Sequence, residues 1–179
     1  MMRYVAFLRA INVGSHVVKM DRLRALVEST GLAQVSTFIA SGNVLFESKK
    51  SPVQLETLLE GTLNTALGYE VTTMVRSADN VARIVDHADT WTRGEEPGVR
   101  LYIGLLKSAP TPEAARKVAA LSNDIDTLAV HGRELYWRCR KSFSESTVAG
   151  PVLGRALGVA VTTRNVTTVR KLAGKLARE

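Results

Sequence analysis

The sequence predicts an α+β fold made of two tandem ferredoxin-like lobes, each with the element order βαββαβ, followed by a C-terminal helix. Two observations support this prediction: an internal repeat at a constant offset of 90 residues, and strand and helix periodicities that follow the same order in both halves. The repeat pairs Leu63, Ala66, Leu67, Gly68, Val71, Thr72 and Thr73 with Leu153, Ala156, Leu157, Gly158, Val161, Thr162 and Thr163. We interpret it as a duplicated unit; the alternative is two independent segments of similar pattern.

The first predicted lobe covers residues 1–76, with strands at 3–10, 35–40, 43–48 and 70–76. Its first helix is expected to begin at Asp21 as N-cap and to stop at Gly31, because glycine adopts positive φ without a Cβ clash. Gly42-Asn43 is a turn pair typical of a hairpin. Ser51-Pro52-x-Gln54 is the pattern of a capping box with proline at the first helical position, so the second helix begins there and ends at Gly68.

Residues 77–98 are expected to link the lobes through a helix at 78–88 and a loop ending at Gly98. The second predicted lobe covers residues 99–179, with strands near 99–106, 126–130, 134–140 and 160–163. Its helices are expected to begin after Thr111-Pro112 and between Ser146 and Pro151. A final helix from Asn165 completes the chain.

The composition is that of a globular chain, with 45% hydrophobic and 23% charged residues among 179, which excludes disordered, collagen-like and disulfide-rich classes. No apolar run approaches the ~20 residues that span a bilayer, and no signal-peptide pattern is present, so we expect no membrane association. The single cysteine, Cys139, allows no intramolecular disulfide and favours a cytoplasmic location.

Charge is divided unevenly along the chain. Residues 1–98 hold 10 Lys and Arg against 11 Asp and Glu, a net charge of −1, whereas residues 99–179 hold 14 against 6, a net charge of +8. A basic second lobe favours an anionic partner; the alternative is a solvated surface that serves solubility.

A first candidate site lies where two loops should meet. The first and second strands of a βαββαβ sheet run parallel, so the loop after the first strand, with Asn12 and Gly14, is expected beside the hairpin Ser41-Gly42-Asn43. Short polar side chains and backbone N–H groups converging there would suit an anion, with Arg9 supplying charge. The alternative is that these glycines and asparagines are turn residues only.

A second candidate surface is basic. Tyr136, Arg138 and Arg140 share one face of the strand at 134–140, where a ring and two guanidiniums would stack a base and neutralise phosphates. The final helix adds a stripe formed by Arg164, Lys171, Lys175 and Arg178. The alternatives are a covered outer face with paired arginines, and cations that only favour the helix dipole.

Catalytic and cofactor motifs have little support. His16, His87 and His131 are far apart in sequence without metal-ligand spacing, so we expect no metal site. Cys139 lies on an apolar strand face and is expected to be inert. Neither a dinucleotide-binding GxGxxG nor a Walker sequence occurs, and no cofactor is expected.

The chain resembles the bacterial domain-of-unknown-function family 1697 in the segments 4–14, 41–44, 156–158 and 163–165 with 168–169. The resemblance implies an α+β fold with two ferredoxin-like subdomains and leaves the activity open. The family's motif residues fall on Arg9, Asn12, Gly14, Ser41, Gly42, Asn43, Ser146, Arg164 and Asn165. The family usually has glycine at Ala10, lysine at Thr147 and tryptophan at Val166.

Within this resemblance, Arg164-Asn165 joins a strand to a helix N-terminus, where an arginine and backbone amides suit a carboxylate or phosphate. We therefore expect a cytoplasmic protein that binds an anion, with nucleic acid as the leading partner. The alternatives are an enzyme for a small phosphorylated or carboxylated substrate, positioned by Arg9, Asn12, Asn43 and Arg164, and an interaction module that docks an acidic protein. The oligomeric state stays open.

Overall fold

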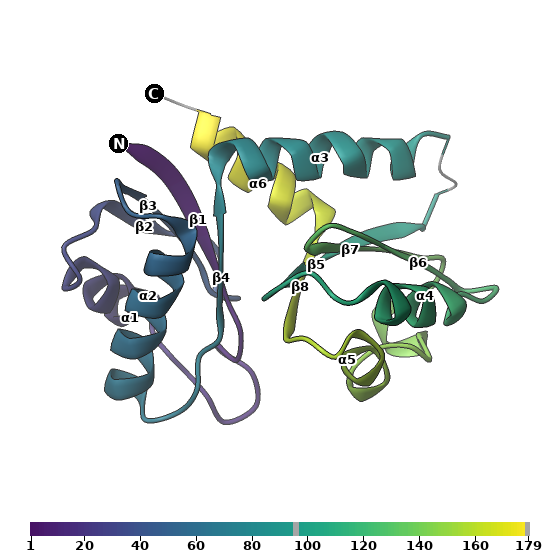
Figure 1. Ribbon diagram of the computed structural model, residues 1–179, viewed down its shortest axis with the longest axis horizontal. Coiled ribbons are helices and arrows are strands. Elements are labelled where there is room, and N and C mark those ends of the chain that lie inside the picture. The colour runs from purple at the N-terminus through teal and green to yellow at the C-terminus, as the bar shows by residue number, and fades with distance from the viewer. Residues whose placement is uncertain (95–96, 178–179) are drawn as a thin grey trace. The chain divides into compact units, whose positions relative to one another are not determined.

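The predicted fold class is confirmed by a computed structural model, which describes residues 1–94 and 97–177. The first half forms a four-stranded antiparallel sheet with strand order β2-β3-β1-β4 (Figure 1). Its elements are β1 (Met2–Leu8), α1 (Met20–Glu28), β2 (Ala33–Thr37), β3 (Asn43–Ser48), α2 (Pro52–Leu67) and β4 (Thr73–Ser77).

The second half repeats this arrangement in a sheet with strand order β6-β7-β5-β8. Its elements are β5 (Arg100–Leu106), α4 (Pro112–Ala120), β6 (Asp126–His131), β7 (Glu134–Cys139), the short 3₁₀ helix η1 (Phe143–Glu145), α5 (Pro151–Leu157) and β8 (Val161–Asn165). Two further helices are α3 (Ala78–Thr92) and α6 (Val166–Ala177). The equal strand orders agree with the predicted duplication.

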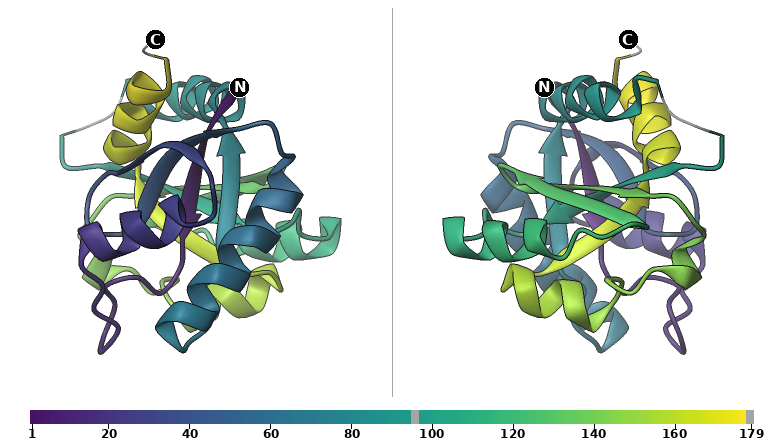
Figure 2. Two further views of the ribbon diagram at one scale, coloured as in Figure 1. Left: turned by 90° about the vertical axis from the view of Figure 1, so that its left-hand side faces the viewer. Right: turned by 90° about the vertical axis from the view of Figure 1, so that its right-hand side faces the viewer.

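Each sheet buries one face under its own pair of helices. In the first sheet, Tyr4, Ala6 and Phe46 pack with Leu23 of α1 and Leu59 of α2. In the second, the corresponding core joins strand residues such as Leu135 and Trp137 to Val118 of α4 and Leu153 of α5. The two views of Figure 2 face these helix layers, α1 and α2 on the left and α4 and α5 on the right.

The chain divides into two compact units. One comprises Met1–Ala82 together with Leu172–Glu179, and the other comprises Arg83–Lys171. This division differs from the predicted lobes at two places, since α3 is shared between the units and the last turns of α6 belong with the first sheet.

The local signals succeeded where a side chain caps a helix. The capping box at Ser51 forms, with the Ser51 N–H donating to Gln54 Oε1 at 2.9 Å, and Gly68 ends α2 with φ of 75°. Asp21, in contrast, is not the N-cap of α1: Lys19 is, and Asp21 lies in the first turn, where its charge favours the helix dipole. The fourth strand begins at Thr73 instead of residue 70.

Candidate functional site

The two loops at one end of the first sheet lie side by side, as the topology predicts. Strands β1 and β2 both run antiparallel to β3, so their carboxyl ends share one edge. The Leu8 N–H donates to the Gly42 carbonyl oxygen at 2.8 Å, and Asn12 Nδ2 donates to the Ala40 carbonyl oxygen at 2.8 Å. These two bonds join the loops directly.

The asparagines of this edge hold the loops in place. Asn12 Oδ1 accepts the Val18 N–H at 2.7 Å, so both ends of its amide are engaged. Asn43 is fully buried, and its Nδ2 donates to the Phe38 carbonyl oxygen at 2.9 Å and to Ser41 Oγ at 3.1 Å. The expectation that Asn12 and Asn43 present their amides to a ligand is therefore corrected, because the loop backbone occupies them.

Gly42 is required by the same loop packing. Its φ is 86°, and a Cβ placed there would lie 3.0 Å from Ile11 Cβ and 3.1 Å from Leu8 Cβ. The neighbouring loop also turns through left-handed residues, with Ala10 at φ of 63°. Glycine adopts that conformation without strain, so the glycine that the resemblance implies at position 10 would suit this loop.

Three of the predicted residues at this edge are exposed: Arg9, Gly14 and Ser41. The Arg9 guanidinium makes no hydrogen bond or ion pair to the part of the chain that the structure describes. Gly14 has φ of 60° and open space around its Cβ position. This edge therefore presents one available cation on a tightly bonded pair of loops.

Arg164 and Asn165 belong to the other compact unit, where both have structural partners. Arg164 is 7% exposed, and its Nη1 donates to Thr162 Oγ1 at 2.7 Å and to the Thr163 carbonyl oxygen at 3.0 Å. Burial lowers the pKa of its guanidinium to about 10. A phosphate-binding role for Arg164 is thus not favoured, because the side chain is buried.

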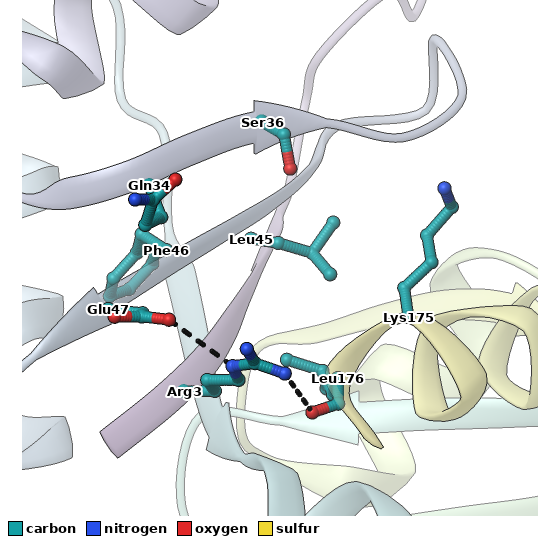
Figure 3. Close-up of a pocket in the computed structure, with 8 residues that line it drawn as sticks. All are labelled: Arg3, Gln34, Ser36, Leu45, Phe46, Glu47, Lys175 and Leu176. Carbon is teal, nitrogen blue, oxygen red and sulfur yellow. Dashed lines mark hydrogen bonds and ion pairs between the residues drawn. The ribbon is translucent and has the colours of Figure 1, made fainter. Parts of the chain in front are cut away.

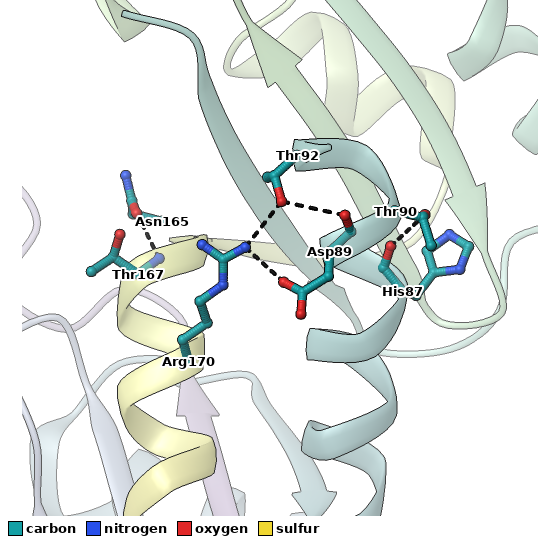
Figure 4. A network of polar contacts seen from close by, with 7 residues as sticks. All are labelled: His87, Asp89, Thr90, Thr92, Asn165, Thr167 and Arg170. Carbon is teal, nitrogen blue, oxygen red and sulfur yellow. Dashed lines mark hydrogen bonds and ion pairs between the residues drawn. The ribbon is translucent and has the colours of Figure 1, made fainter. Parts of the chain in front are cut away.

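Asn165 caps the start of α6. Its Oδ1 accepts the Thr167 N–H at 2.8 Å, which occupies one of the amides expected to be free for an anion (Figure 4). One turn later, Arg170 Nη2 pairs with Asp89 Oδ1 of α3 at 2.8 Å. This segment is a helix cap followed by an ion pair.

Tyr136 does not lie on an open sheet face, which corrects the expectation of a base-stacking surface there. Its side chain is 1% exposed, with the His87 ring centroid at 4.4 Å and the Trp91 ring centroid at 6.0 Å, both from α3. Burial and the Glu134 charge raise the pKa of its hydroxyl. The strand alternation identified the face correctly, but α3 covers it.

Arg138 and Arg140, which follow Tyr136 along the chain, are more exposed than Tyr136 and lie at the end of the second sheet. Arg138 is half-buried, and its Nε is buried without a hydrogen-bond partner among residues 1–94 and 97–177. Arg140 is exposed, with its Nη1 3.4 Å from Thr127 Oγ1. Lys141 follows it, and Arg100 lies opposite Cys139 in the strand register. We call Arg100, Arg138, Arg140 and Lys141 the basic rim.

An exposed aromatic ring lies in the loop that continues from the basic rim. Phe143 is 45% exposed and lies edge-on to Tyr102, at a centroid distance of 5.5 Å, and 5.1 Å from Trp137. Phe143 is not among the site residues predicted from the sequence. Its signal was the pattern Ser142-Phe143-Ser144-Glu145, a serine followed by glutamate three positions later, which predicts a helical turn that fixes the ring. The structure forms this capping box.

A buried carboxylate holds this loop against the sheet. Asp126 is fully buried, and it accepts hydrogen bonds from Trp137 Nε1 at 2.7 Å and from Ser146 Oγ at 2.9 Å. Ser146, one of the positions matched by the family resemblance, therefore acts as an anchor for residues 140–150. Phe143 lies in this anchored loop, whereas Arg100 and Arg138 are held by the pairing of β5 with β7.

Two acidic side chains belong to the same end of the sheet. Asp124 is exposed in the turn before β6, and Glu145 is exposed with hydrogen bonds from Ser142 that lower the pKa of its carboxyl. The four cations of the basic rim outnumber these two exposed carboxylates by two, and outnumber the acidic groups by one when the buried Asp126 is counted.

Of the three cations predicted in the final helix, Lys171 is exposed, and Lys175 lies in the first unit with its Nζ 4.9 Å from the centroid of the Phe38 ring. Arg178 is outside the described residues.

Nucleophilic and metal chemistry have little support in the described ranges. The Cys139 Sγ lies 3.2 Å from the Lys141 carbonyl oxygen, and burial raises the pKa of the thiol. No three His, Cys, Asp or Glu side chains in residues 1–94 and 97–177 gather closely enough to hold a metal ion. Over the same residues, no helix combines the length and apolar character needed to cross a membrane.

The fold is that of two tandem ferredoxin-like lobes, and the candidate binding residues of the second lobe are the basic rim and Phe143 at one end of its sheet. The chain belongs to the family described as protein of unknown function (DUF1697), whose model matches residues 1–136. Among solved structures it is similar to a conserved bacterial protein from Streptococcus pneumoniae, with 22% identity, a TM-score of 0.78 and coverage of 98% of each chain. A comparison with curated proteins finds no match.

Proposed function

We propose that this protein binds single-stranded nucleic acid through the basic rim and Phe143. The observation that carries the proposal is an exposed aromatic ring, Phe143, which packs on Trp137 and Tyr102 in the loop that follows Arg138, Arg140 and Lys141 in sequence. Cations neutralise phosphates, and an exposed ring stacks a base without regard to its sequence.

Single strands are favoured over duplexes because a stacking ring needs an unpaired base. The single cysteine, buried and free, fits a reducing cytoplasm, where nucleic acid is present. The enzyme alternative has less support, because the side chains of Asn12, Asn43 and Arg164 form hydrogen bonds within the protein.

The test is fluorescence anisotropy with labelled single-stranded RNA, single-stranded DNA and duplex of about 16 nucleotides, the upper site size of small single-strand-binding folds. If each cation of the basic rim meets one phosphate, log K should fall with log salt at a slope of about −2.8, that is 4 × 0.7. Arg140→Ala with Lys141→Ala should reduce the slope by about 1.4. Phe143→Ala should weaken binding by a factor of about 5–150, corresponding to ~1–3 kcal/mol per stacked base.

The matched control is Arg116→Ala with Lys117→Ala, which removes two exposed cations from α4 and changes the net charge equally. The proposal requires this control to retain binding. Equal losses in both double variants would mean attraction by net charge alone, and absence of binding at low salt would exclude nucleic acid as the partner.

A further inference from the structure

A cavity of about 510 Å³ lies on the first compact unit, and its lining shares no residue with the loop edge or the basic rim. It opens on the face of the first sheet opposite α1 and α2, between β2, β3 and the last turn of α6 (Figure 3). Its lining includes Arg3, Gln34, Ser36, Leu45, Glu47 and Lys175. The volume falls within the range of small-molecule sites, about 300–1,000 Å³.

Arg3 closes one side of the cavity and brings no net charge to it. Its Nε donates to Glu47 Oε1 at 3.2 Å, and its Nη1 donates to the Leu176 carbonyl oxygen at 3.3 Å. The charge of the Arg3 guanidinium is thus balanced by the Glu47 carboxylate, and the group bridges β3 and α6, as Figure 3 shows. The paired Arg3 and Glu47 side chains form one wall of the cavity.

Lys175 supplies the one positive charge of the cavity lining that is not paired with a carboxylate of the lining. Its Nζ lies over the Phe38 ring and has no carboxylate partner in the described part of the chain. The charged groups of the lining therefore sum to one positive charge, from Arg3, Glu47 and Lys175. A cavity with this balance suits a ligand with one negative charge better than a dianion.

The remaining lining is apolar at the floor and polar at the edge strand. Leu45 is 8% exposed and projects into the cavity between the β2 side chains and Lys175 (Figure 3). The Gln34 amide and the Ser36 hydroxyl make no hydrogen bond to residues 1–94 or 97–177. A ligand can therefore place an apolar chain on Leu45 while its oxygen atoms meet Lys175 and the two neutral groups.

We propose that this cavity is a binding site for a small organic monocarboxylate that carries a short apolar chain. The carboxylate pairs with the Lys175 ammonium and accepts a hydrogen bond from Ser36 or Gln34. The chain covers Leu45 and the side of α6. This site is independent of the nucleic-acid proposal, because its residues belong to a different compact unit from the basic rim.

The test is an NMR titration of the full-length protein, following backbone amide shifts with sodium hexanoate, acetate, phosphate and hexylammonium chloride as separate probes. Hexanoate should saturate and shift the amides of Ser36, Leu45 and Leu176. Hexanoate has four more methylene groups than acetate. If the cavity removes about half of their surface from water, hexanoate should bind on the order of tenfold more tightly than acetate. Phosphate should bind more weakly than hexanoate, and hexylammonium should leave these amides unchanged.

Lys175→Gln should abolish the preference of the cavity for hexanoate over hexanol, a neutral probe of the same chain length titrated in the same way, because the substitution keeps most of the side-chain stem and removes the charge. Lys171→Gln is the matched control: it removes an exposed lysine one turn earlier on the same helix, outside the cavity lining. Ser36→Leu, a substitution at an exposed strand position, should block the cavity and eliminate hexanoate binding.

Each other result would overturn the proposal. Hexanoate shifts that do not saturate, or that Lys175→Gln leaves unchanged, would exclude the cavity as a carboxylate site. Phosphate binding equal to hexanoate would exclude the apolar chain as a recognition feature. Arg140→Ala with Lys141→Ala should leave hexanoate binding intact, so failure of one proposal is distinguishable from failure of the other.

Discussion

Replacing Asp126 with alanine should be among the most damaging single substitutions in the second unit. The carboxylate is fully buried and accepts two hydrogen bonds, from Trp137 Nε1 and Ser146 Oγ. A hydrogen bond to a charged group contributes about 1.5–3 kcal/mol, and a buried donor left without its acceptor costs a similar amount. We expect Asp126→Ala to lower the free energy of unfolding by about 3–5 kcal/mol, a large share of the ~5–15 kcal/mol typical of a domain.

Urea denaturation followed by far-UV circular dichroism measures this loss without depending on the tryptophan signal. Asp126→Asn keeps an acceptor for Trp137 and should lose about half as much, which preserves the measurement if the alanine variant does not fold. The control is Asp124→Ala, two residues earlier and exposed, which should change stability by no more than about 0.5 kcal/mol. A loss below about 1 kcal/mol in Asp126→Ala would refute the anchoring role.

Two further predictions concern Gly42 at the loop edge and His87, whose ring stacks on that of His131 at a centroid distance of 4.2 Å. Gly42→Ala should lower the free energy of unfolding by about 2–4 kcal/mol, because φ at position 42 is positive and an added Cβ would lie 3.0 Å from Ile11 Cβ. Gly14 also has positive φ but open space around its Cβ position, so Gly14→Ala should lower it by only about 1 kcal/mol in the same denaturation assay. Equal losses would contradict the steric argument. Burial and the nearby His131 lower the pKa of His87 in the folded protein. As the pH falls, His87 is therefore protonated in the unfolded chain before it is protonated in the folded protein. The free energy of unfolding should decrease from a pH of about 6.5 down to the folded pKa of His87. His87→Gln should flatten this part of a melting-temperature profile, and an unchanged profile would show that His87 does not contribute.

Most of the fold could be predicted from the sequence because it depends on features that act locally or repeat. The capping box at Ser51 and the glycine stop at Gly68 are short-range signals, and the repeated segments specify the same strand order twice. The meeting of the Asn12 and Gly42 loops followed from topology alone. These parts required no knowledge of side-chain packing.

The candidate site depended on packing that the sequence does not reveal. Alternation placed Tyr136 on the correct face of its strand, but it does not say that His87 and Trp91 of α3 cover that face. Similarly, an asparagine in a loop looks the same whether its amide meets a ligand or, as in Asn43, the carbonyl of Phe38. The pattern from Ser142 to Glu145 predicts the turn that carries Phe143, but the sequence does not show that the ring packs on Trp137 and Tyr102 and stays exposed.

The composition of the first compact unit has a consequence for how the protein is made. Residues 83–171 separate its two segments, so at about 5–20 residues per second the ribosome needs roughly 5–20 s to deliver the second segment after the first. During that interval Arg3 lacks its Leu176 contact and the cavity lacks the wall that carries Lys175. A nascent chain or a truncation ending at Lys171 would therefore display the first sheet with one side unfinished, a state open to chaperones and proteases.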